Sequence, residues 1–123
     1  MSWKIRGLAT AGVYVDDYAK AVAFYQTELG FEKKTDMSET SCWGRIGDLG
    51  LFIVKGDGTR SEISRSGCKA TLVLNFEHGF TSFFDRMKEQ GAALDEQPIP
   101  LDGMKASFFR FRDPAGNVLE AAG

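Results

Sequence analysis

Hydrophobic and polar positions alternate along residues 8–15, which is the spacing of a β-strand with one buried face. Apolar residues then recur at helical spacing over residues 18–29, and either of the two aspartates before them can cap a helix. Gly30 follows, a residue type that commonly ends a helix in a left-handed conformation. Three short strands are expected next, at residues 31–37, 41–46 and 49–55.

The same order of periods begins again 61 or 62 positions later. Residues 70–76 are apolar and β-branched, which predicts a strand, and apolar residues over 80–87 again follow a helical spacing. Gly91 ends this second helix as Gly30 ends the first. Three further strands are expected, with a turn between the last two; the ranges are 93–99, 104–112 and 117–121, and the turn is 113–116.

Each half therefore reads strand, helix and three strands, which predicts an α+β protein of two βαβββ modules in tandem. One module alone would leave a sheet face uncovered, because a single helix covers only one side. Two modules related by a pseudo-twofold axis can instead form a curved mixed sheet around a cleft. We expect one domain over residues 1–123, with module one at about 8–55, a linker at about 56–67 and module two at about 68–121.

The composition is that of a soluble globular protein, and it narrows the classes of partner. Hydrophobic residues make up 43% of the chain, charged residues 26%, and the net charge is −2. No basic run points to nucleic acid or to an anionic membrane. No apolar segment approaches the ~18 residues of a membrane span, and no secretory signal is visible. For Cys42 and Cys68 we expect free thiols in a cytoplasmic protein, a bridge between them being the alternative.

Three parts of the sequence carry a resemblance to a known family. Residues 13–17, followed by 21–25 and 29–31, and residues 111–120 resemble signatures of the glyoxalase/bleomycin-resistance/dioxygenase superfamily, also called the vicinal oxygen chelate fold. Together with the two-module layout, the resemblance spans nearly the whole chain and supports the predicted fold. It leaves the function open, because that fold carries isomerases, ring-cleaving dioxygenases, thiol transferases and non-catalytic drug-sequestering proteins.

In metal-dependent members of that family, each module supplies two ligands to one divalent ion, one early on its first strand and one on its last. The resemblance places these positions at Thr10, approximately Thr71, a residue in 52–54, and Glu120. Only Glu120 is a suitable ligand, and a transition metal needs about three or four nitrogen, sulfur or carboxylate donors. His78, the single histidine, falls in the turn before the second helix and is expected at the surface. The sequence thus predicts no metal cofactor, with a divalent metal as the alternative.

Aromatic and small side chains are the candidate lining of the cleft. Thr10 and Tyr14 share one face of the first strand with Gly12, and Trp43 shares a face of its strand with Arg45. Tyrosine and tryptophan rings can stack on a flat ligand, and the arginine guanidinium adds a fixed positive fork. A core position is the alternative for Trp43, since large side chains on strands are commonly buried.

Two further parts of the sequence leave alternatives open. Alternation puts Phe109 and Phe111 on one face and Phe108 on the other, without indicating which face lines the cleft. Glu120 is either a solvated residue near the chain end or, as the resemblance favours, a cleft carboxylate that contacts a ligand amine or acts as a base. It is the one candidate catalytic residue. The candidate ligand-binding residues are Thr10, Tyr14, Trp43, Arg45, Phe52, Phe109, Phe111 and Glu120.

These observations lead us to expect a metal-free protein that binds a small molecule, like the bleomycin-resistance branch of the family, with a planar aromatic antibiotic as one candidate ligand. The resemblance also implies a homodimer, and ten phenylalanines exceed what one small core needs. The main alternative is a glyoxalase-like lyase or isomerase, or a dioxygenase, with a degenerate divalent-metal site centred on Glu120. A third is a regulatory module that associates through exposed strand edges.

Overall fold

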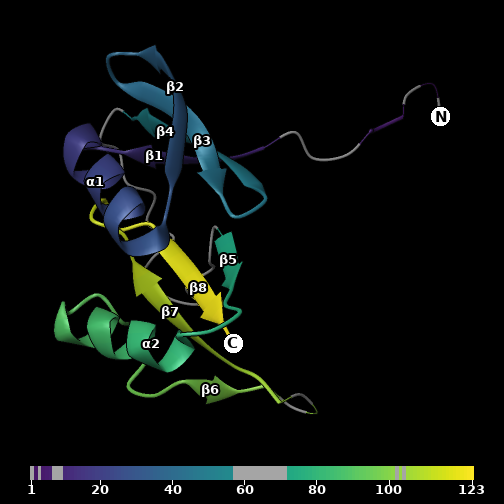
Figure 1. Cartoon of the computed structure of the whole chain (residues 1–123), viewed down its shortest axis with the longest axis vertical. Coiled ribbons are helices and arrows are strands. Elements are labelled where there is room, and N and C mark those ends of the chain that lie inside the picture. The colour runs from purple at the N-terminus through teal and green to yellow at the C-terminus, as the bar shows by residue number, and fades with distance from the viewer. Residues whose placement is uncertain (1, 3, 7–9, 57–71, 102, 104) are drawn as a thin grey trace. The chain divides into compact units, whose positions relative to one another are not determined.

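The computed structural model describes residues 2, 4–6, 10–56, 72–101, 103 and 105–123. The chain divides into two compact units, Met1–Asp57 and Gly58–Gly123. Each unit contains one helix and one four-stranded sheet, formed in the order strand, helix and three strands along the chain (Figure 1). This confirms the predicted α+β fold of two tandem βαβββ modules. Most of the predicted linker, together with Cys68 and Thr71, lies outside the described residues.

The first unit forms a mixed sheet with the strand order β1-β4-β3-β2. Strand β1 runs parallel to β4, and the other neighbouring strands are antiparallel. The strands predicted at 41–46 and 49–55 have the observed bounds, whereas the first observed strand begins at Ala11, and residues 8 and 9 of its predicted range lie outside the described residues. The elements are β1 (Ala11–Val15), α1 (Tyr18–Leu29), β2 (Glu32–Ser38), β3 (Ser41–Ile46) and β4 (Leu49–Lys55).

Helix α1 begins and ends where the sequence predicts. At its start, the Asp17 carboxylate accepts a hydrogen bond from the backbone N–H of Lys20 at 3.1 Å, which satisfies one of the donors left free by the first turn. At its end, Gly30 has a φ of 69° and donates its N–H to the carbonyl of Tyr25. Most residues are strained at that φ, so the glycine fixes the position of the helix end.

The alternation along the central strands gives sheet one two different faces. One face is buried against α1 and carries Val13, Val15, Cys42, Leu51 and Ile53. The Tyr18 hydroxyl of α1 reaches this face: burial raises its pKa, and a hydrogen bond with the free thiol of Cys42 adds to that shift. The opposite face, which α1 leaves uncovered, is termed the open face of sheet one.

The second unit repeats this topology with the strand order β5-β8-β7-β6. Strand β5 is parallel to β8, as β1 is to β4, so the two halves have the same connectivity. Between β7 and β8, the predicted turn is held by the buried Asp113 carboxylate, which accepts the backbone N–H groups of Ala115 and Asn117. The elements are β5 (Leu72–Asn75), α2 (Phe80–Glu89), β6 (Ile99–Pro100), β7 (Ser107–Arg112) and β8 (Val118–Ala122).

Aromatic rings form the core of the second unit between α2 and its sheet. Phe109 and Phe111 project from β7 towards the helix and are both 0% exposed. The ring centroid of Phe83 lies 5.8 Å from that of Phe109 and 5.1 Å from that of Phe111. Phe84 meets Phe109 edge to face at 4.9 Å. These contacts account for the phenylalanine stripe that predicts the second helix.

The segment 93–99 differs from its prediction as a strand. Only Ile99 and Pro100 pair as β6, with one isolated bridge between Ala93 and Phe111. Between them, the Asp95 carboxylate accepts the backbone N–H of Arg110 at 2.8 Å and so replaces a backbone carbonyl of the ladder. A proline at position 98 also has no N–H to donate, so the strand is interrupted.

Truncating Phe109 should strongly destabilise the protein, because the substitution removes a fully buried ring and leaves a cavity. We expect Phe109→Ala to lower the free energy of unfolding by about 3–5 kcal/mol, measured by urea denaturation. The control is Val73→Thr, which keeps a branched side chain at a position that is 60% exposed and should change stability by less than about 0.5 kcal/mol. Equal effects of the two substitutions would contradict the assigned core.

Candidate functional site

The open face of sheet one brings together most of the aromatic residues predicted to bind a ligand. Tyr14 on β1 is 70% exposed, and Trp43 on β3 and Phe52 on β4 are half-buried. Phe52 pairs across the strands with Trp43 on one side and with Gly12 on the other. Because Gly12 has no side chain, the residue paired directly with Phe52 on that side does not cover its ring. The result is a ring-bearing surface that a flat molecule can approach.

Trp43 is held on this face by two residues that flank it in space. Its indole N–H donates a hydrogen bond to the Thr10 hydroxyl at 3.2 Å. Gly50 lies under the ring: a side-chain carbon at that position would be only 3.1 Å from Cζ2 of the indole. Trp43 therefore belongs to the open face, although part of its ring is buried against β4.

Arg45 lies at the end of the same face, next to the turn between β3 and β4. It is exposed, pairs across the strands with Gly50 and donates from its guanidinium to the carbonyl of Asp48 at 3.0 Å. This hydrogen bond fixes the guanidinium beside the turn. The face thus combines aromatic rings with the Arg45 guanidinium near its edge, where Glu32 of β2 is the cross-strand partner of Arg45.

Glu120 lies on the corresponding uncovered face of the second sheet, termed the open face of sheet two. It is half-buried on the central strand β8, where Val73 is its neighbour on β5 and Arg110 its neighbour on β7. The expected orientation, away from the helix-covered core, follows from the alternation with the buried residues Leu119 and Ala121. Glu120 is therefore a carboxylate on a sheet face and not a solvated tail residue.

Asp95 engages the arginine beside Glu120 through several hydrogen bonds. Nη2 of Arg110 lies 2.6 Å from Oδ1 of Asp95, and Nε of Arg110 lies 3.3 Å from Oδ2. The Asp95 side chain is 10% exposed and that of Arg110 is 29% exposed, so the pair is largely shielded from solvent. The hydrogen bond from the Arg110 side chain lowers the pKa of Asp95, although burial acts in the opposite direction. This pair fixes the guanidinium next to Glu120.

Phe109 and Phe111 do not lie on an open face, which corrects the expectation that they line a ligand cleft. Both rings face α2 and are fully buried among its phenylalanines. The alternation of residues along this strand did not indicate which of its two faces is covered. In the structure, α2 covers the face that carries Phe109 and Phe111. The partly exposed Phe108 lies on the opposite face, beside Arg110. We therefore leave Phe109 and Phe111 out of the candidate site.

The strand register tests whether a divalent metal of the family type fits the residues present. Gly12 pairs with Phe52 in the first unit as Val73, 61 positions after Gly12, pairs with Glu120 in the second. Phe52 is thus the counterpart of Glu120, and a phenyl ring offers no ligand. Thr10 hydrogen-bonds to Trp43, and no group of three or more potential ligands (His, Cys, Asp or Glu) occurs among the described residues. These donors do not fit such a metal.

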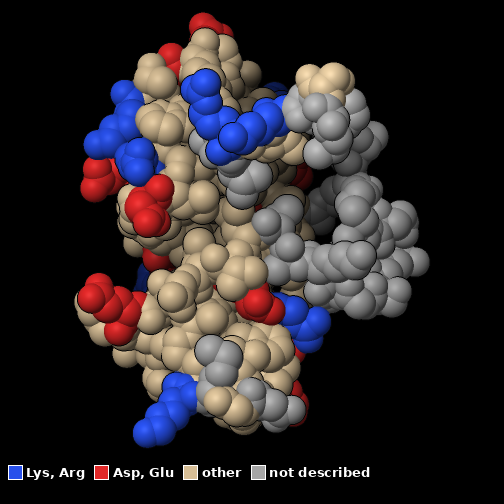
Figure 2. Space-filling model, turned by 90° about the vertical axis from the view of Figure 1, so that its right-hand side faces the viewer, with Lys and Arg blue, Asp and Glu red and all other residues tan. Residues whose placement is uncertain are grey.

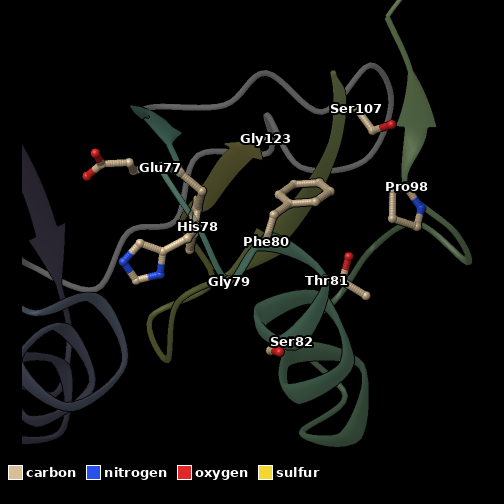
Figure 3. Close-up of a pocket in the computed structure, with 10 residues that line it drawn as sticks. Glu77, His78, Gly79, Phe80, Thr81, Ser82, Pro98, Ser107 and Gly123 are labelled. Carbon is tan, nitrogen blue, oxygen red and sulfur yellow. The ribbon is translucent and has the colours of Figure 1, made fainter. Parts of the chain in front are cut away.

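A hollow of about 460 Å3 lies within the second unit, around the start of α2 (Figure 3). His78 and Glu77 belong to its lining, and both are exposed. In Figure 3 their side chains point away from Ser107 and Pro98, which lie on the other side of the Phe80 ring. The hollow therefore does not direct the side chains of Glu77 and His78 towards Ser107. The predicted surface position of His78 is confirmed.

Two residues of the open faces escaped the sequence analysis. Gly50 lies within a predicted strand, and a glycine there is itself a signal of a close approach by another group. Asp95 gave no such signal, because its role depends on Arg110, which is 15 positions away in the chain. Only the structure could identify that pair.

The charges on the visible surface agree with the composition. On the face shown in Figure 2, Lys and Arg occur in separate groups with Asp and Glu among them. This distribution is unlike the continuous basic surface of nucleic-acid-binding proteins. No helix in the described part of the chain is long and apolar enough to cross a membrane.

Comparison with known proteins gives consistent matches over nearly the full length. A family model described as Glyoxalase/Bleomycin resistance protein/Dioxygenase superfamily matches residues 7–121. The chain is 28% identical over 123 residues to the uncharacterized protein YetH of Bacillus subtilis (strain 168), covering 93% of this chain and 95% of that protein.

Solved structures share the fold at low sequence identity. The crystal structure of the fosfomycin resistance protein FosX from Listeria monocytogenes has a TM-score of 0.77 at 20% identity, covering 97% of this chain and 93% of that one. Lactoylglutathione lyase from Agrobacterium tumefaciens has a TM-score of 0.69 at 16% identity, covering 97% and 94% of the two chains. At these identities the likeness concerns the fold alone.

The Asp95–Arg110 pair should make stability depend on pH in the acid range. An unperturbed aspartate has a pKa of about 3.9. Because the folded state lowers the pKa of Asp95, the stabilisation is complete above about pH 5 and is lost as the pH falls through the folded-state pKa. We expect Asp95→Asn to lower the free energy of unfolding at pH 7 by about 1.5–3 kcal/mol, with a smaller difference at pH 2–3.

Urea denaturation at a series of pH values measures this effect. The matched control is Asp48→Asn, which changes an exposed carboxylate and should leave both the stability and its pH dependence nearly unchanged. A difference between the Asp95 variant and the parent that stays constant from pH 7 to pH 2 would contradict the assigned pairing.

Proposed function

Because the chain belongs to the glyoxalase/bleomycin resistance protein/dioxygenase superfamily, we propose that it binds a small molecule without a metal cofactor, in the manner of the bleomycin-resistance branch. The ligand is a planar, ring-bearing molecule of the kind found among antibiotics, and it is held rather than transformed. The binding surface is the open face of sheet one, with Tyr14, Trp43 and Phe52 as stacking groups. Arg45 is the charged group beside them.

The observation that carries this proposal is the alignment of aromatic rings on an uncovered sheet face. Trp43 and Phe52 are paired across β3 and β4, and Tyr14 stands two residues beyond Gly12 on β1. The fully buried rings, such as Phe109, lie on the helix-covered faces and form the hydrophobic core. The rings on the open face are therefore not part of the packing between helix and sheet. Partly exposed rings gathered on one surface are typical of sites for flat ligands.

The donor set supports binding without a divalent metal. Phe52 occupies the module-one position that corresponds to Glu120, and Thr10 is a neutral hydroxyl already hydrogen-bonded to Trp43. One carboxylate with neutral hydroxyls, here Thr10 and in sequence Thr71, is a weak donor set for a transition metal. In this proposal Glu120 instead binds a positively charged group of a ligand on the open face of sheet two.

A metal-dependent enzyme is the second candidate, favoured by the place of Glu120 and by one solved structure with the same fold. Glu120 lies on the open face of β8, and one related structure of FosX is complexed with Mn(II) and 1S,2S-dihydroxypropylphosphonic acid. On this alternative the chain is a glyoxalase-like lyase or isomerase, or a dioxygenase, whose degenerate site is centred on Glu120. The homodimer and the cytoplasmic location expected from the sequence form part of both proposals.

Fluorescence titration against a panel of planar antibiotics tests the ligand-binding proposal. The chain has two tryptophans, so the titration uses a Trp3→Phe background in which Trp43 alone reports. We expect quenching or a spectral shift with at least one compound, and a Kd raised by a factor of about 2–12 in Phe52→Leu. The matched control is Phe24→Leu, the same change on α1, which should leave the Kd unchanged. No response across the panel would argue against this function.

Elemental analysis separates the two candidates. Protein purified without added metal should contain far less than one equivalent of Zn, Ni, Mn or Fe, and Glu120→Gln should leave that content unchanged. About one equivalent of metal that is lost on Glu120→Gln would establish the metal-dependent alternative. Glu77→Gln provides the control for nonspecific loss, because Glu77 is an exposed carboxylate away from the sheet faces.

A further inference from the structure

We propose that Thr10 and Gly50 are positioning residues, which fix the indole of Trp43 in the orientation that a stacked ligand requires. This inference rests on the proposed function, because it concerns the same open face. It adds a role for two residues that need not touch the ligand. In this assignment Thr10 acts through Trp43 and is not itself a ligand-binding group.

The first step of the argument is the hydrogen bond that Thr10 provides. The indole N–H of Trp43 donates to the Thr10 hydroxyl at 3.2 Å, across 33 positions of sequence. The hydroxyl in turn donates to the carbonyl of Ala11 at 3.4 Å, so its proton is directed away from the indole. Both bonds are half-buried, which limits competition from water. The indole edge is thus anchored to the beginning of β1.

The second step is the space that Gly50 leaves. A side-chain carbon at position 50 would lie 3.0 Å from the Thr10 hydroxyl oxygen, 3.1 Å from Cζ2 of Trp43 and 3.3 Å from its Nε1. These distances are shorter than ordinary van der Waals contact. A methyl group there would force the indole or the hydroxyl to shift by a few tenths of an ångström. Gly50 therefore allows the ring to lie against β4 while it keeps its hydrogen bond.

The third step connects this anchoring to binding. A tryptophan on an uncovered strand face has two side-chain torsions to restrict when a ligand stacks on it. If the free protein already holds the ring in place, that ordering cost is absent from the binding free energy. The cross-strand neighbour Phe52 then meets the ligand beside a ring of fixed orientation. Loss of the anchor should weaken binding without removing any group that contacts the ligand.

The test compares Thr10→Val, Thr10→Ser and Gly50→Ala, all in the Trp3→Phe background. Valine has the shape of threonine but cannot accept the indole hydrogen bond, whereas serine keeps the hydroxyl. Two readouts need no ligand: the NMR exchange rate of the Trp43 indole N–H with solvent, and the time-resolved fluorescence anisotropy of Trp43. The third is the Kd for the tightest-binding compound of the antibiotic panel.

We expect Thr10→Val and Gly50→Ala to speed indole exchange, to increase fast depolarisation and to raise the Kd by roughly twofold to twelvefold. Thr10→Ser should restore all three values. An indole that is equally immobile in Thr10→Val would overturn the positioning role, and so would a mobile indole with an unchanged Kd. If no compound binds the parent, the proposed function fails, but exchange and anisotropy still decide whether Thr10 and Gly50 hold the ring.

Discussion

One constraint shapes both units: within the described residues, each four-stranded sheet has a single helix to cover it. Successive side chains of a strand point to opposite faces, so the apolar ones along the central strands must face the helix. The residues between them lie on the open face and need not serve the core. In the first unit the buried set includes Leu51 and Ile53, and the intervening Phe52 lies on the open face. In the second, Leu119 and Ala121 are buried and Glu120 lies between them. The candidate sites follow from this division.

Most of the fold could be predicted because its signals are local. The cap at Asp17, the left-handed Gly30 and the turn at Asp113 each depend on a few neighbouring residues, and all three are found in the structure. The segment 93–99 could not be predicted, since its irregular path depends on Asp95 meeting Arg110 of another strand. Pro98 is a local signal of an interrupted strand, but the pairing of Asp95 with Arg110 is not contained in any local pattern.

The candidate site could be predicted only in part, because alternation identifies two faces without indicating which one a helix covers. The same uncertainty applied to Trp43 and to Phe109, yet the structure exposes part of the first and buries the second completely. The strand pairing also shows that Phe52 and Glu120 occupy equivalent positions in the two sheets, which the sequence pattern of either unit alone does not contain. The two units thus keep one backbone plan while one open face is aromatic and the other is charged.

Strand β2 has a consequence for how copies of this chain can meet. It lies at the edge of its sheet, all seven of its residues are exposed, and its pairing with β3 shifts twice, between Lys33 and Thr35 and between Asp36 and Ser38. A straight edge would offer evenly spaced donors and acceptors to a foreign strand and so invite aggregation. The irregular, charged edge matches such a partner poorly, which protects the chain from uncontrolled sheet extension along β2.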